Sequence, residues 1–140
     1  MIEKVKSIYI KYREQILYLI FGGVTTLITI ITYNLLYEKL NLSNNFANVV
    51  AWVLSVTFAY ITNRKFVFES RNKNKIEEAF LFYGSRLLSG TADFIIMYYL
   101  VDIKHINWET LAKAAVNIII VILNYILSKL IVFKKNGKKK

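Results

Sequence analysis

Residues 59–70 read AYITNRKFVFES and end an apolar run with an aromatic, a polar and a basic residue followed by Val-Phe. Residues 124–135, NYILSKLIVFKK, repeat this order 65 positions later. The matched residues are Tyr60 and Tyr125, Arg64 and Lys129, Val67 and Val132, and Phe68 and Phe133. Self-similarity at a fixed spacing indicates a duplicated architecture. The chain is therefore predicted to consist of two equivalent helical hairpins.

Composition points to a membrane protein. The 140 residues are 56% hydrophobic yet carry a formal charge of +10, and the mean hydropathy is +0.40. Long apolar runs with basic flanks are typical of membrane proteins. Because the basic residues lie between apolar runs and not along one face, we expect no nucleic-acid partner. Cysteine is absent and His105 is the single histidine, so we expect neither a metal site nor a cofactor.

Four apolar stretches are predicted to be transmembrane helices, since each approaches the length that crosses a bilayer. They are residues 16–37, 46–62, 79–101 and 111–128. Residues 1–14 alternate apolar and basic positions at helical spacing, which predicts an amphipathic interfacial segment. Residues 134–140 form a basic tail.

The distribution of lysine and arginine predicts the orientation. The amino-terminal segment carries four, the connection between the second and third stretches five, and the carboxy-terminal end six, against one in each of the other two connections. The positive-inside rule then places both termini and the central connection in the cytoplasm. The expected fold is an all-α integral membrane protein with a single membrane domain. It is a four-transmembrane-helix bundle built from a parallel tandem repeat of two hairpins, N-in and C-in.

Three ionisable residues fall within the predicted spans: Arg86, Asp93 and Lys113. Such groups are costly in lipid and indicate function by default. Arg86 and Asp93 are about 10 Å apart along one helix, too far for direct pairing. Lys113 is expected at a depth close to that of Asp93, so Asp93–Lys113 is the preferred ion pair. The pair could be functional or could only fix the bundle.

A polar stripe on the last span adds to these charges: Lys113, Asn117, Asn124 and Ser128 share one face. Polar faces in lipid must look toward protein or a water-filled cavity. The interpretation we favour is a hydrophilic cavity, with helix packing as the alternative.

Arg64 and Lys129 lie one turn beyond Tyr60 and Tyr125 at the predicted cytoplasmic ends. They can be snorkelling anchors beside an aromatic belt. Alternatively, the two cations bind a phosphate, Arg64 through a bidentate fork and Lys129 as a point charge.

Catalysis has little support in the sequence. Asp93 is the single carboxylate within a predicted span, so no paired-carboxylate site is expected. Glycine-rich phosphate loops and hydrolase motifs are also absent. We expect that the protein is not an enzyme.

Four segments resemble the GtrA-like family of small four-helix bacterial membrane proteins: FGGVTTLITIITYNLL (21–36), AYITNRKFVF (59–68), FYGSRLL (82–88) and NYILSKLIVFK (124–134). The resemblance implies a multi-pass protein of the bacterial cytoplasmic membrane. It also implies flipping of polyprenyl-phosphate-linked sugars for cell-envelope glycosylation, including that of O-antigen and teichoic acid. Asn63 and Arg64 match the first family ending, and Asn124, Tyr125 and Lys129 the second. Ser128 and Leu130 depart from it, so Arg64 should matter more than Lys129.

The resemblance, combined with residue depth, gives a predicted route for the substrate. Arg64 and Lys129 capture the phosphate, Arg86 holds it midway, and Lys113 receives it near the outer side. The sugar meets a polar cavity formed by Asn63, Asn117, Asn124, Asp93, Tyr60 and Tyr125.

Expected partners are the lipid-linked sugar and membrane lipid, with a membrane glycosyltransferase and a second copy in a homodimer as further candidates. One alternative function is a non-transporting adaptor that recruits a glycosyltransferase. Another is a small proton-coupled exporter that uses Asp93 as its proton carrier.

Overall fold

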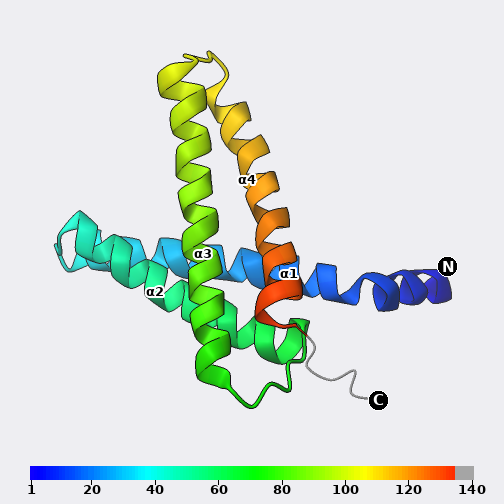
Figure 1. The fold of residues 1–140 in the computed structure, drawn as a ribbon. Coiled ribbons are helices and arrows are strands. Elements are labelled where there is room, and N and C mark those ends of the chain that lie inside the picture. The colour runs from blue at the N-terminus through cyan, green and yellow to red at the C-terminus, as the bar shows by residue number, and fades with distance from the viewer. Residues whose placement is uncertain (135–140) are drawn as a thin grey trace. The chain divides into compact units, whose positions relative to one another are not determined.

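The computed structural model describes residues 1–134, which form helices and connections without a strand. The predicted basic tail therefore lies outside the described residues, except for Lys134. The chain divides into two compact units, Met1–Ser70 and Arg71–Lys140. Each unit contains one helical hairpin (Figure 1). This division agrees with the two hairpins expected from the sequence repeat.

Unit 1 contains α1 (Ile2–Asn34) and α2 (Asn44–Thr62). Each helix continues into a five-residue π turn, η1 (Leu35–Lys39) after α1 and η2 (Asn63–Val67) after α2. The side chain of Ser43 caps α2 by accepting a 3.3 Å hydrogen bond from the Phe46 N–H. Such a cap satisfies one of the free amides at a helix start.

The first helix joins two segments that the sequence separates. Residues 1–14 and 16–37 were expected as an interfacial segment and a span, and α1 together with η1 runs through both. A kink lies close to the expected boundary between the two segments, because Tyr12 has non-helical angles of φ −112° and ψ 17°.

Unit 2 contains α3 (Lys75–Tyr98), η3 (Tyr99–Ile103), α4 (Glu109–Leu127) and η4 (Ser128–Val132). Helix α3 starts four residues before the predicted span. Asn74 caps it by accepting from the Glu77 N–H at 3.2 Å and donating to the Glu77 carboxylate at 2.9 Å. The first bond caps the helix, and the second holds the Asn74 side chain in place.

The π turns end in the same way at three places. After η2, the Phe68 N–H donates to the Asn63 carbonyl at 2.9 Å and the Ser70 N–H to the Arg64 carbonyl at 2.8 Å. The intervening residue Glu69 has a positive φ of 48°. Equivalent turns place Asn41 (φ 51°) and His105 (φ 49°) in the left-handed region. The sequence placed Asn63 and Arg64 in the central connection; they belong instead to the end of the second helix.

An aromatic contact recurs in each unit. Tyr18 of α1 packs edge-on against Phe68 with ring centroids 6.4 Å apart. Phe82 of α3 packs against Phe133 at 5.8 Å. All four rings are buried. The first helix of unit 1 therefore corresponds to the first helix of unit 2 at a spacing of 64 residues, and the second helices correspond at a spacing of 65. The difference arises because the connection within unit 2 (residues 104–108) is one residue longer than that within unit 1 (40–43).

Three helices have the length and apolar composition to cross a membrane: Ile2–Lys39, Asn44–Val67 and Glu109–Val132. Within residues 1–134, α3 does not meet this criterion. It contains Arg86 and Asp93, which lower its hydropathy. The chain is an all-α membrane protein, and the crossing by residues 79–101 stays a prediction.

Candidate functional site

An ion pair joins the two helices of unit 2. The Lys113 ammonium nitrogen of α4 lies 2.6 and 2.8 Å from the two carboxylate oxygens of Asp93 on α3. The Asp93 side chain is 27% exposed and that of Lys113 44%. This is the pair preferred from the sequence, and the structure confirms it.

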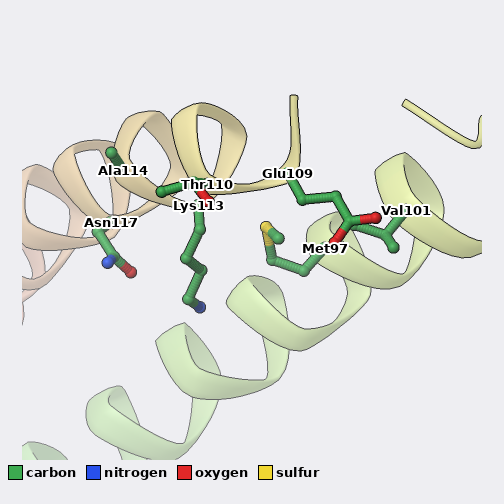
Figure 2. A pocket seen from close by; sticks show the side chains of 7 residues that line it. All are labelled: Met97, Val101, Glu109, Thr110, Lys113, Ala114 and Asn117. Atoms are coloured by element: carbon green, nitrogen blue, oxygen red, sulfur yellow. The ribbon is translucent and has the colours of Figure 1, made fainter. Parts of the chain in front are cut away.

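A groove of about 520 Å³ opens beside this ion pair, between α3 and α4 (Figure 2). It is an open groove on the surface of the hairpin and not an enclosed cavity. From α3 it is lined by Met97 and Val101, and from α4 by Glu109, Thr110, Lys113, Ala114 and Asn117. The groove lies toward the end of the hairpin where residues 104–108 connect the helices.

The polar lining comes from one face of α4. Glu109, Lys113 and Asn117 are spaced by four residues, and such residues lie above one another on a helix. Figure 2 shows the Lys113 side chain extending toward α3 and the Glu109 side chain reaching across toward Val101. Of the residues predicted to form the polar cavity, Asn117 lies in this groove lining, next to Lys113, whereas Asp93, Asn124 and Tyr125 lie outside it.

Glu109 is a residue that the sequence interpretation missed. It was assigned to the connection before a span starting at residue 111, whereas α4 begins at Glu109. The sequence signal that could have identified Glu109 is its position four residues before Lys113, which places both residues on one helix face. A carboxylate in the first turn is also favoured by the helix dipole.

In unit 1 the corresponding positions carry polar side chains that bind one another. The Tyr33 hydroxyl donates to the Asn44 side-chain oxygen at 2.6 Å, and the Asn48 amide donates to the same oxygen at 3.1 Å. At the spacings of 64 and 65 residues, Tyr33 corresponds to Met97, Asn44 to Glu109 and Asn48 to Lys113. In unit 1 these polar groups therefore bind one another, while in unit 2 their counterparts line a groove.

The first predicted phosphate ligand, Arg64, lies in η2 and is half-buried. One of its guanidinium nitrogens is 3.5 Å from the Ser70 hydroxyl, at the limit of a hydrogen bond. Asn63 before it is buried, with its amide donating to the Ala59 carbonyl at 2.6 Å. The Asn63 side-chain oxygen has no hydrogen-bond partner among the described residues. Tyr60, one turn earlier, is half-buried.

The counterpart in unit 2 is Lys129 of η4, which is exposed. Its ammonium lies 3.3 Å from the Tyr125 hydroxyl and 5.6 Å from the centre of that ring. Ser128 is fully buried, and its hydroxyl and the Asn124 side-chain oxygen have no hydrogen-bond partner within residues 1–134. The two units thus share a cation at the same step of a π turn, although its surroundings differ.

Arg86 is placed against an aromatic ring. Its guanidinium carbon lies 4.6 Å from the centre of the Phe82 ring. Phe82 is fully buried and Arg86 is half-buried. Stacking of this kind stabilises the position of the arginine side chain. Glu78, one turn before Phe82, is a buried carboxylate that the sequence interpretation left in the central connection.

The amino-terminal segment of α1 is tied to the end of α2. The Arg13 guanidinium forms a 2.9 Å ion pair with Glu69 and donates to the Phe66 carbonyl at 3.3 Å. Phe21 stacks on Phe66 with centroids 5.5 Å apart. This contact, unseen in the sequence, fixes the turn that carries Arg64.

Comparison with known proteins gives consistent matches. Residues 17–133 match the family described as the GtrA/DPMS transmembrane domain. A cell wall teichoic acid glycosylation protein, GtcA, of Listeria innocua is 47% identical over 122 residues, covering 85% of this chain and 83% of the relative. A protein of the same name from Listeria monocytogenes is 41% identical over 130 residues, covering 88% and 89%. The uncharacterized membrane protein YwcD of Bacillus subtilis is 41% identical over 126 residues, covering 88% and 98%. No solved structure matches the chain.

Proposed function

Since this chain belongs to the GtrA/DPMS transmembrane-domain family, we propose that it flips polyprenyl-phosphate-linked sugars across the bacterial cytoplasmic membrane. Membership confirms the resemblance drawn from the sequence. The relatives named as teichoic acid glycosylation proteins support a role in cell-wall glycosylation. They also support a multi-pass location in the cytoplasmic membrane.

The observation that carries the proposal is the cation at the end of each second helix. A lipid-linked sugar has an anionic phosphate at the boundary between its apolar tail and its polar head. Arg64 is half-buried in a π turn, beside the buried Asn63. An arginine in such a position can bind a phosphate through two parallel hydrogen bonds. Lys129 stands at the same step in unit 2, so each hairpin offers one phosphate ligand.

The path across the membrane needs further polar groups, because moving a bare phosphate into hydrocarbon is prohibitive. Arg86 supplies a cation on α3 held against Phe82. Asn124 contributes a buried amide oxygen without a hydrogen-bond partner among the described residues. In this account Arg86 contacts the phosphate during passage. Flipping breaks no covalent bond, so we assign no catalytic residue.

The test is a flipping assay in vesicles that contain only the purified protein. Arg64→Ala is expected to slow flipping at least about tenfold, the loss expected for one hydrogen bond to a charged group. Lys65→Ala is the matched control, because Lys65 is an exposed cation in the same π turn, placed over the Phe66 ring. Its rate should match that of the unchanged protein. Arg64→Lys should fall between the two, since lysine cannot form the bidentate fork.

Two results would overturn the proposal. Equal rates for Arg64→Ala and Lys65→Ala would remove Arg64 from the route. Absence of flipping by the purified protein, together with a requirement for it in cell-wall glycosylation, would favour the adaptor that recruits a glycosyltransferase.

A further inference from the structure

We infer that the groove between α3 and α4 binds the sugar of the lipid-linked substrate and that Glu109 makes it selective for uncharged sugars. The inference rests on the proposed function and deepens it by naming the class of head group. It also changes the expected role of Lys113 from a phosphate ligand to a positioning residue.

The charges beside the groove argue against an anionic ligand. The Lys113 ammonium contacts both oxygens of Asp93, at 2.6 and 2.8 Å. Its positive charge is therefore balanced within the protein. Glu109 is then the remaining charge in the lining. A phosphate or a sugar acid in the groove would face this carboxylate, and like charges placed together oppose binding.

The same side chains suit a hydroxyl-rich, uncharged ligand. A carboxylate accepts hydrogen bonds, and an asparagine amide both donates and accepts. Glu109 and Asn117 are two helical turns apart, about 12 Å along the axis. Sugar hydroxyls, which donate and accept, can bind both ends of this stripe while the ring lies against Met97. Methionine suits such a wall because its side chain is flexible and polarizable.

The duplication supports the assignment. In unit 1, Tyr33 takes the position of Met97, and the Asn44 oxygen accepts from both Tyr33 and Asn48 at 2.6 and 3.1 Å. The polar side chains at these positions of unit 1 therefore form hydrogen bonds with one another. In unit 2 the shorter, apolar Met97 and the charged Glu109 leave the polar stripe of α4 accessible in a groove.

Selectivity is tested with two lipids that share one polyprenyl phosphate, one carrying glucose and the other glucuronate. Glucose carries a hydroxymethyl group at the position where glucuronate carries a carboxylate. The unchanged protein should flip the glucose lipid at least about tenfold faster, because like charges placed together cost several kcal/mol. Glu109→Gln should narrow this ratio by accelerating the glucuronate lipid. Asp102→Asn removes an exposed carboxylate from η3, outside the groove lining, and should leave the ratio unchanged.

Occupancy of the groove is tested separately by cysteine labelling, which has no background because the chain lacks cysteine. Ala114→Cys lies in the groove lining, and Asn107→Cys lies in the connection before α4. The glucose lipid should protect Ala114→Cys from a water-soluble thiol reagent and leave Asn107→Cys reactive. Met97→Tyr, which copies Tyr33, should fill the groove and slow flipping of the glucose lipid.

The outcomes separate the two proposals. Flipping of both lipids at equal rates, or a ratio unchanged by Glu109→Gln, overturns the groove assignment and leaves the flippase intact. So does an unprotected Ala114→Cys in a protein that flips the glucose lipid. Failure of the unchanged protein to flip either lipid overturns the proposed function and this inference with it.

Discussion

The Tyr18 ring lies edge-on to Phe68, with centroids 6.4 Å apart, and so joins the first helix of unit 1 to the residue just beyond the π turn of the second. Phe82 makes the corresponding contact with Phe133 in unit 2. In each unit this aromatic contact lies close to the π turn that presents a cation. Packing of the hairpin therefore positions the proposed phosphate ligands.

Phe82→Ala is expected to be strongly destabilising. The side chain is fully buried, and removing a buried phenylalanine costs about 3–5 kcal/mol. Phe80→Ala removes a ring that is 75% exposed from the same helix and should cost less than about 1 kcal/mol. The measurement is the free energy of unfolding of the detergent-solubilised protein. Equal losses for the two variants would contradict the packing described for unit 2.

The Asp93–Lys113 pair should show energetic coupling. Removal of one partner leaves the other charge without its neighbour, and fully buried pairs then lose about 3–5 kcal/mol. Because Lys113 is 44% exposed, we expect a smaller coupling, about 1–2 kcal/mol. A double-mutant cycle of Asp93→Asn and Lys113→Met measures it in unfolding experiments.

The exposed Arg13–Glu69 ion pair is the reference with which the Asp93–Lys113 coupling energy is compared. Its side chains are 39% and 63% exposed, and such surface pairs contribute about 0–1 kcal/mol. Additive effects of Asp93→Asn and Lys113→Met would show that their contact does not stabilise α3 against α4.

His105→Gly is expected to raise stability by about 0.5–1 kcal/mol, because glycine adopts a positive φ without the steric cost of a side chain. His105 has a φ of 49° in the turn that ends η3. Asn107→Gly, in the same connection but outside the positive-φ positions of the described chain, should be neutral or destabilising. Thermal unfolding of the two variants distinguishes them, and a loss for His105→Gly would contradict the turn geometry.

Much of the fold follows from the sequence repeat. The copies of the Val-Phe ending at 65-residue spacing predict two hairpins, and the structure divides the chain after Ser70. Helix ends are less predictable. Arg64 and Lys129 lie in π turns whose existence depends on backbone hydrogen bonds such as that from Phe68 to Asn63. Side-chain hydropathy does not report these bonds, so the helices were predicted to end too early.

The candidate site was predicted in part. Asp93, Lys113 and Asn117 were recognised because polar residues in an apolar run stand out. Glu109 was missed because it lies at a helix end, where a carboxylate is ordinary. The groove was not predicted, because its lining combines residues of two helices, Met97 and Val101 of α3 with the face of α4 that carries Glu109, Lys113 and Asn117.

The number of crossings is tested by labelling single cysteines in whole cells. Lys73→Cys lies between η2 and α3, in the predicted cytoplasmic connection. Asn41→Cys and Asn107→Cys lie in the connections within the two hairpins. An impermeant thiol reagent should label the latter two in intact cells and Lys73→Cys only after permeabilisation. This is the positive-inside orientation. Labelling of Asn107→Cys and Lys73→Cys from the same side would show that α3 does not cross the membrane.

The proposed function requires that this protein alone moves a lipid-linked sugar across a bilayer. The most direct measurement is transfer of polyprenyl-phosphate glucose between leaflets of vesicles with and without the purified protein. We predict transfer that rises with the number of protein molecules per vesicle, falls at least about tenfold in Arg64→Ala and persists in Lys65→Ala. Transfer no faster than in protein-free vesicles, by a protein that is folded and correctly oriented, would show that the protein is not a flippase.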